Sequence, residues 1–169
     1  MISTIPRTAV IRHRRNSGVG RAFNEGLRQA QHDAARWLLT VDQDSTLTPG
    51  YVQHITSLAE GAGALTVRLG ALGAGNVCDV SGPLNYPGKP LDGTNLVSTE
   101  EVIASGTLWN VEQLLGAGGF DETLGMDAVD AAACLALRGK GSVVAIAPEL
   151  SMAHNLGRAR RIHAFGRSM

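Results

Sequence analysis

The chain has 169 residues, of which 44% are hydrophobic, and its fifteen basic side chains balance fifteen acidic ones. This length and composition predict a single soluble globular domain, large enough to bury a core without disulfides. The balanced charge excludes a general electrostatic attraction to nucleic acid, and no apolar run is long enough to span a bilayer. Cys78 and Cys134 have no metal-ligand spacing, and the start of the chain has no secretory signal, so a cytosolic compartment is favoured.

Short β-branched runs alternate with helical patterns in the first half of the chain. Ala22, Leu27 and Ala30 recur at the spacing of an amphipathic helix, and Pro49 suits the first turn of a later helix. In chain order we predict a strand, a loop, a helix, a buried strand and a second helix, at residues 8–11, 16–20, 21–35, 37–45 and 50–60.

The second half continues this alternation. We predict a strand, a Gly-rich loop, a short strand, exposed turns, a longer strand, two helices and a final buried strand, at residues 64–69, 70–75, 77–80, 85–93, 96–105, 111–115, 127–137 and 142–147. Cys134 falls in the second of these helices, where a small buried hydrophobic residue is expected. Strands that alternate with helices predict one α/β domain with a mostly parallel sheet flanked by helices.

Two aspartates follow the predicted buried strand that begins at Trp37. Because side chains of an extended segment alternate between faces, Asp42 and Asp44 should point the same way. Two such carboxylates repel each other unless a cation lies between them, and Mg²⁺ and Mn²⁺ prefer oxygen ligands. The carboxyl ends of strands are also where open α/β sheets bind ligands. The alternative is an ordinary surface turn, in which Asp and Ser are common.

Glycines precede the first predicted helix, in the segment from Asn16 to Asn24. Such glycines let the backbone approach a ligand, and the amino end of a helix favours an anion. The segment lacks the lysine of a P-loop and matches no dinucleotide-binding pattern. A loop followed by a helix cap explains it equally well.

Acidic residues gather around the start of the helix predicted at residues 127–137. Four carboxylates lie within residues 121–130, and Asp127 and Asp130 are three apart, hence neighbours on a helical turn. One of them could serve as a general base; alternatively, acids early in a helix only offset its macrodipole. His154 follows the last predicted strand, where it is either a metal ligand or a structural hydrogen-bonding group.

These segments occur in the order found in one known family. They are an Asn- and Gly-containing loop and helix, DQDS, SG, GGFDE, D-x-VD and HNLG, at residues 16–26, 42–45, 105–106, 118–122, 127–130 and 154–157. The set resembles the rhamnosyltransferase-like branch of family 2 glycosyltransferases. The resemblance implies a GT-A-like nucleotide-diphospho-sugar transferase fold over residues 1–157, with residues 158–169 as a basic tail.

The resemblance also implies roles for single residues. Asp42 and Asp44 match the D-x-D that binds the donor diphosphate through Mg²⁺ or Mn²⁺, with Asp44 a direct metal ligand and His154 a further one. Asp130 matches the acid that deprotonates the acceptor hydroxyl. The loop and helix that border the donor nucleotide are matched by Asn16, Gly18, Asn24 and Gly26. The acceptor side is matched by Ser105, Gly106 and Asp127.

The function implied by this resemblance is metal-dependent, inverting transfer of a sugar. The donor would be a nucleotide-diphospho-sugar such as dTDP-rhamnose, and the acceptor a glycan or a lipid-linked glycan; nucleic acid is not an expected partner. The reaction would take place in the cytoplasm or at the inner face of the cell membrane. There the basic tail, with Arg158, Arg160, Arg161 and Arg167, could contact anionic lipids.

Two departures from the family pattern favour an alternative. The family's first βαβ unit, which holds the base and ribose, has no counterpart before Asn16, so the fold is expected to be amino-terminally truncated. Ala132, Ala133 and Ala136 stand where the family often has an acid, an aromatic residue and an arginine. The alternative is therefore a non-catalytic GT-A domain, a folded remnant or an interaction module. Absence of the first unit would expose a sheet edge, which favours a partner such as a second copy of the chain.

Overall fold

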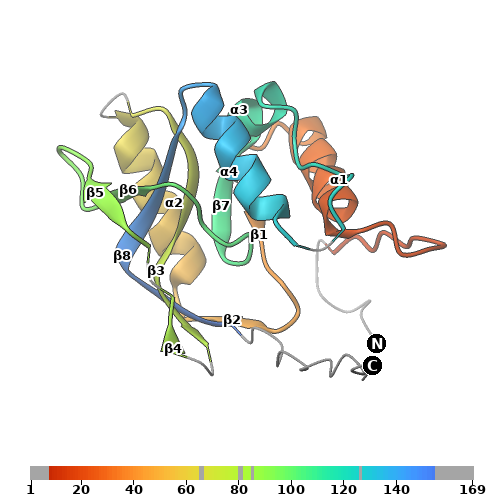
Figure 1. The fold of residues 1–169 in the computed structure, drawn as a ribbon, viewed down its shortest axis with the longest axis horizontal. Coiled ribbons are helices and arrows are strands. Elements are labelled where there is room, and N and C mark those ends of the chain that lie inside the picture. Colours follow the sequence, from red (N-terminus) through yellow and green to blue (C-terminus); the bar gives the residue numbers. More distant parts are fainter. Residues whose placement is uncertain (1–7, 65–66, 80–81, 85, 126, 155–169) are drawn as a thin grey trace, which may run out of the picture.

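A mixed sheet with helices on both faces forms the centre of the protein (Figure 1). The computed structural model describes residues 8–64, 67–79, 82–84, 86–125 and 127–154. In chain order the elements are α1 (Val19–His32), β1 (Trp37–Thr40), β2 (Ser45–Leu47), α2 (Tyr51–Ala64), β3 (Leu69–Asp79), β4 (Gly82–Pro83), β5 (Gly88–Pro90), β6 (Val97–Thr99), β7 (Thr107–Asn110), α3 (Val111–Gly116), α4 (Val129–Gly139) and β8 (Val143–His154).

The strand order across the described sheet is β1-β7-β3-β8-β6-β5, with β2 paired to β8 and β4 paired to β3. Only β3 and β8 run parallel among the described pairs, and the others are antiparallel. The α/β architecture with helices on both faces of a sheet, predicted from the sequence, is confirmed, but the sheet is mixed rather than mostly parallel. Parallel pairs need crossover connections, and the described residues from β4 to β7 include no helix that could supply one.

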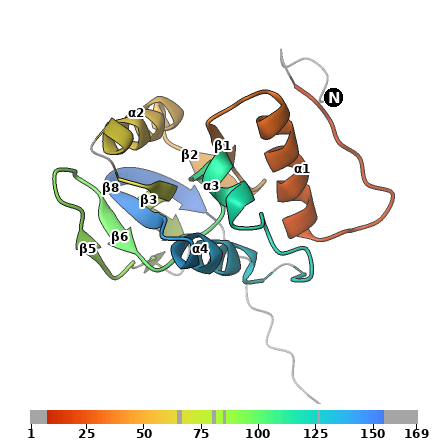
Figure 2. The ribbon, with the colours of Figure 1, turned by 90° about the horizontal axis from the view of Figure 1, so that it is seen from above.

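The sheet separates two hydrophobic cores. Figure 2 shows α2 on one side of β3 and β8, and α4 on the other. Neighbouring residues in β3, Ala71 and Leu72, belong to opposite cores, as do Leu108 and Trp109 in β7. This alternation follows from the two-residue period of a strand. Helix α2 therefore covers one face, while α1, α3 and α4 contribute to the core on the other.

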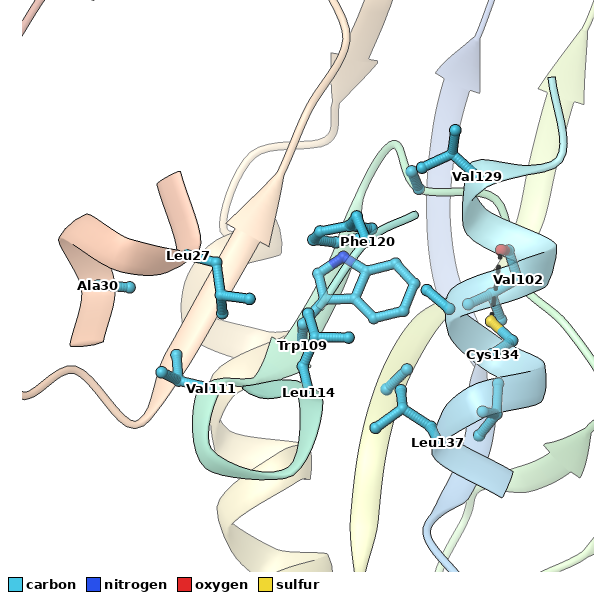
Figure 3. Close-up of a cluster of buried hydrophobic side chains, with 14 of the residues drawn as sticks. Leu27, Ala30, Val102, Trp109, Val111, Leu114, Phe120, Val129, Cys134 and Leu137 are labelled. Atoms are coloured by element: carbon cyan, nitrogen blue, oxygen red, sulfur yellow. Dashed lines mark hydrogen bonds between the residues drawn. The ribbon is translucent and has the colours of Figure 1, made fainter. Parts of the chain in front are cut away.

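Trp109 lies at the centre of the core that α1, α3 and α4 share (Figure 3). It is fully buried, and its ring meets that of Phe120 edge-on at a centroid distance of 5.2 Å, a favoured aromatic geometry. Cys134 is buried in the same core, as predicted, and its thiol faces the carbonyl oxygen of Val102. Burial raises the pKa of this thiol to about 12, so it remains protonated and behaves as a small apolar group.

The four predicted helices are confirmed, with shifted ends. Several predicted strands and loops are wrong. At residues 64–69, predicted as a strand, Ala64 ends α2 and β3 begins only at Leu69, and the strand predicted at residues 96–105 is limited to β6. Residues 8–11 form no strand, since no described strand pairs with them and their side chains are exposed. Residues 70–75, predicted as a loop, lie inside β3. There a Cβ atom on Gly73 would come within 3.1 Å of Thr107 Oγ1, and one on Gly75 within 2.6 Å of Pro148 Cα. The glycines therefore serve close packing rather than a turn.

Candidate active site

Asp42, Asp44 and His154 come together at one end of the sheet, although the sequence separates them widely. The two aspartates lie in the turn between β1 and β2, and His154 ends β8. Antiparallel pairing of β2 with β8 sets Ser45 opposite His154, which brings the turn to the histidine. One potential ligand atom from each of the three side chains lies within 4.8 Å of the others.

The buried strand ends earlier than the sequence pattern predicts. It stops at Thr40, so Asp42 and Asp44 belong to a hydrogen-bonded turn rather than to an extended segment. The backbone amide of Ser45 donates to the carbonyl of Asp42 at 3.2 Å, which closes the turn. The two carboxylates are nevertheless brought together, as predicted, but turn geometry rather than strand alternation is the reason.

Two serine hydroxyls fix this turn. The Oγ atom of Ser105 accepts a hydrogen bond from the backbone amide of Asp42 at 2.9 Å and lies 2.7 Å from Ser45 Oγ. Ser45 Oγ is in turn 2.6 Å from His154 Nδ1. A side chain that binds a metal through one atom is commonly oriented by a hydrogen bond to another of its atoms. The role of Ser45 was not assigned from the sequence, because its contact with His154 spans more than a hundred residues of chain.

Buried hydrogen bonds of Thr40 hold the two neighbours of Ser105, Ala104 and Gly106, in place. Thr40 Oγ1 donates to the carbonyl of Ala104 and accepts a hydrogen bond from Trp109 Nε1 at 2.8 Å. The amide of Gly106 donates to the carbonyl of Thr40 at 2.8 Å. Gly106 has a φ of 73°, and a Cβ atom there would collide with Met152 Sδ. The Ser105-Gly106 pair is therefore buried and shaped by the core beneath the turn.

The electrostatics of the site favour a cation. The pKa of Asp42 is raised, mainly because the carboxyl group is partly buried. The negative charges of Asp44 and Asp130 raise this pKa further, whereas His154 lowers it. His154 Nδ1 lies 3.6 Å from Asp44 Oδ1. Two carboxylates and an imidazole in reach of one another match the oxygen and nitrogen ligands of divalent ions such as Mn²⁺. The residues present thus fit the predicted metal site.

Asp130 is connected to the same turn through the segment that contains Ser105. It is half-buried in the first turn of α4, and its Oδ2 atom accepts a hydrogen bond from the amide of Ala104 at 3.1 Å. Its Oδ1 atom accepts from the amide of Ala131 at 2.9 Å. These backbone donors hold the carboxylate on the side of the molecule that carries Asp42, whose pKa responds to the charge of Asp130.

The residues predicted to border the donor nucleotide lie on and before α1. The side chain of Asn24 donates to the carbonyl of Phe120 at 2.8 Å and to Glu122 Oε1 at 2.9 Å, and accepts from the amide of Phe120 at 2.8 Å. The amide of Gly18 donates to Asn16 Oδ1 at 3.0 Å, and a Cβ atom on Gly26 would be in ordinary contact with Leu38. The structure thus shows Asn24 binding the 118–122 loop, and nucleotide binding by these residues stays a prediction.

The three residues predicted for the acceptor side differ in exposure. Ser105 and Gly106 are buried, whereas Asp127 is exposed just before α4. An acceptor could therefore reach Asp127 directly, whereas Ser105 contacts the turn that carries Asp42. A role for these three residues in acceptor binding stays a prediction. The HNLG motif beyond His154 and the basic tail lie outside the described residues.

Comparison with known proteins shows what the chain is similar to. Residues 2–80 match the family model of Glycosyl transferase family 2. The chain is 26% identical over 149 residues to the dTDP-rhamnosyl transferase RfbF of Shigella flexneri, which covers 85% of this chain and 50% of that protein. The chain is thus similar to glycosyl transferase family 2 over just under half of its length. The predicted likeness to its rhamnosyltransferases is confirmed, and the chain spans about half the length of this curated relative.

The solved structure of GalNAc-T7 with UDP, GalNAc and Mn²⁺ has a fold similar to that of this chain. The TM-score is 0.65 at 12% sequence identity, and the match covers 86% of this chain and 32% of the other. A structural match at such a low identity shows only that the two chains share the GT-A fold. In the part of the chain that the structure describes, no helix is long and apolar enough to cross a membrane.

Proposed function

We propose that this chain transfers a sugar from a nucleotide-diphospho-sugar donor to a hydroxyl group of an acceptor. The observation that carries the proposal is the convergence of Asp42, Asp44 and His154 at the end of the sheet, beside the segment that holds Asp130. Similarity to a dTDP-rhamnosyl transferase supports rhamnose as the sugar and dTDP as the carrier. By the same similarity, a glycan or lipid-linked glycan is the proposed acceptor.

Asp42, Asp44 and His154 would hold the divalent cation, Mg²⁺ or Mn²⁺, that accompanies the donor diphosphate. When bound, such a cation offsets the negative charge that develops on a leaving diphosphate. The chain's own contribution is to keep the ligands in place. Ser45 orients His154, and Ser105 fixes the backbone of Asp42, so the cluster is largely formed before any ligand binds.

Asp130 is the proposed general base. It would take the proton of the acceptor hydroxyl while the hydroxyl oxygen forms a bond to the anomeric carbon of the donor sugar. The bond from that carbon to the diphosphate oxygen breaks, and its electron pair leaves with the nucleoside diphosphate. Attack from the face opposite to the leaving group inverts the anomeric configuration. The two backbone amides on Asp130 hold the carboxylate oxygens in fixed directions for this step.

One observation favours the alternative of a non-catalytic domain. Ala132 and Ala136, on α4, line a hollow of about 470 Å³ together with Asn24 and the 117–122 loop. The resemblance leads us to expect larger polar side chains at these two positions, and the alanines leave the space beside the loop open. A domain that no longer turns over substrate could keep its fold and its metal ligands while this surface served another contact.

An assay of dTDP release separates the two proposals. We expect the wild-type chain, with dTDP-rhamnose, Mn²⁺ and a rhamnoside acceptor, to release dTDP. Asp130→Asn should lower kcat by at least about 100-fold, the usual contribution of a general base, while dTDP still binds. Asp121→Asn, which changes an exposed acid bound to Thr123, is the matched control and should keep the wild-type rate. A folded chain that binds dTDP but releases none from the donor would support the non-catalytic alternative.

A further inference from the structure

A small pocket opens beside Asp130, next to the segment that leads to Ser105. Its volume is about 170 Å³. It is lined by Tyr86, Glu101, Val102, Ile103, Asp130 and Ala131. No lysine, arginine or histidine is among these residues, so the pocket suits a neutral hydroxyl-bearing group better than an anion.

Tyr86 contributes the one neutral polar side chain of this lining. Its ring packs against both hydrophobic cores, which fixes its position. Its hydroxyl oxygen is shielded from solvent and has no hydrogen-bond partner among the residues that the structure describes. The backbone of Ile103 faces this oxygen, but the contact is not a hydrogen bond of ordinary geometry. A buried hydroxyl without a partner is costly, so its presence calls for a physical explanation.

The charge of Asp130 acts on this hydroxyl. Burial is the main cause that raises the pKa of Tyr86 to about 12, and the negative charge of Asp130 adds to it. Tyr86 therefore keeps its proton at physiological pH and can donate it in a hydrogen bond. A carboxylate has about four acceptor positions, and the amides of Ala104 and Ala131 use two of those on Asp130. Asp130 can still accept a bond from Tyr86.

We propose that Tyr86 is a positioning residue for Asp130. In the working enzyme its hydroxyl donates to the Asp130 carboxylate, so that the carboxylate is held from a third direction while one lone pair remains for the acceptor proton. This inference rests on the proposed role of Asp130 as general base. It accounts for a buried, unpaired hydroxyl in the pocket beside that residue, where a phenylalanine would fill the same space.

The test compares Tyr86→Phe with Ser142→Ala. Ser142 Oγ is also buried without a partner among the described residues, but it lies before the start of β8, at the opposite end of that strand from His154. Both variants remove an unpaired hydroxyl and keep the packing nearly unchanged. We expect Tyr86→Phe to lower kcat about tenfold with an unchanged KM for the donor, as for loss of one hydrogen bond to a charged group. Ser142→Ala should keep the wild-type kcat.

A second readout does not depend on activity. The amide protons of Ala104 and Ala131 bond to the Asp130 carboxylate, so their NMR signals report its position. With dTDP and Mn²⁺ bound, the state in which the Tyr86 hydroxyl is proposed to reach Asp130, we expect Tyr86→Phe to shift both signals and Ser142→Ala to leave them in place. Shifted signals without turnover of the wild-type chain would keep the positioning role and reject the proposed function. Unmoved signals in Tyr86→Phe, or a wild-type kcat in that variant, would overturn the inference.

Discussion

Asp42 combines a half-buried position with two acidic neighbours, and this makes it sensitive to pH. Its pKa is raised first by burial, and also by Asp44 and Asp130 against the effect of His154. A carboxyl group whose pKa is higher in the folded chain than in the unfolded chain destabilises the fold wherever it is ionised in both states. This penalty is present at neutral pH, declines as the pH falls through the raised pKa, and is gone below the ordinary value of 3.8.

Asp42→Asn should therefore stabilise the cation-free protein at pH 7. We expect a gain in the free energy of unfolding below about 1.4 kcal/mol, the equivalent of one pKa unit, since solvent screens a half-exposed charge. The gain should shrink toward zero near pH 4. Urea denaturation in the presence of EDTA at both pH values measures it. A variant less stable than wild type at pH 7 would show that Asp42 is not under the repulsion described here.

Glycines within β3 link element geometry to stability. Gly75→Ala should destabilise the protein by about 1–3 kcal/mol, the usual cost of overpacking, because its Cβ would lie 2.6 Å from Pro148 Cα in the adjacent strand β8. Gly61→Ala in α2 is the matched control. Nothing lies within 4 Å of its Cβ position, so it should stabilise the helix by about 0.5–1 kcal/mol. The midpoints of urea unfolding of the two variants measure these changes in stability. Equal midpoints would contradict the packing described for β3.

The same glycines show where sequence patterns reach their limit. All four helices were predicted from local sequence, by apolar spacing for the first and by Pro49 for the second, because a helix depends mainly on residues close in sequence. The Gly-rich run at residues 70–75 gave no local sign of a strand. Its glycines are required by close contacts with Thr107, Val102 and Pro148, which lie far away in the sequence. The pairing of β2 with β8, which delivers His154 to the aspartates, is equally non-local. Only the ordered set of family motifs placed that histidine in the site.

At the level of the whole molecule, the sheet carries the site at one end and has two edges, β1 and β5. Trp37, Leu38 and Leu39 of β1 are only partly buried by the described residues. The expectation that a second copy of the chain covers an edge stays a prediction. Sedimentation of the purified chain tests it: a dimer is the expected species, and a stable monomer would contradict the expectation.

Asp42, Asp44 and His154 are proposed to bind a divalent cation together with a nucleoside diphosphate. Calorimetric titration of dTDP and UDP, with and without Mn²⁺, tests it most directly, with Asp44→Ala as the variant and Asp121→Asn as the control. We predict binding of at least one nucleotide that requires Mn²⁺, disappears in Asp44→Ala and persists in Asp121→Asn. Nucleotide binding that is equal with and without the metal, or unchanged in Asp44→Ala, would contradict the account, as would a folded wild-type chain that binds neither nucleotide.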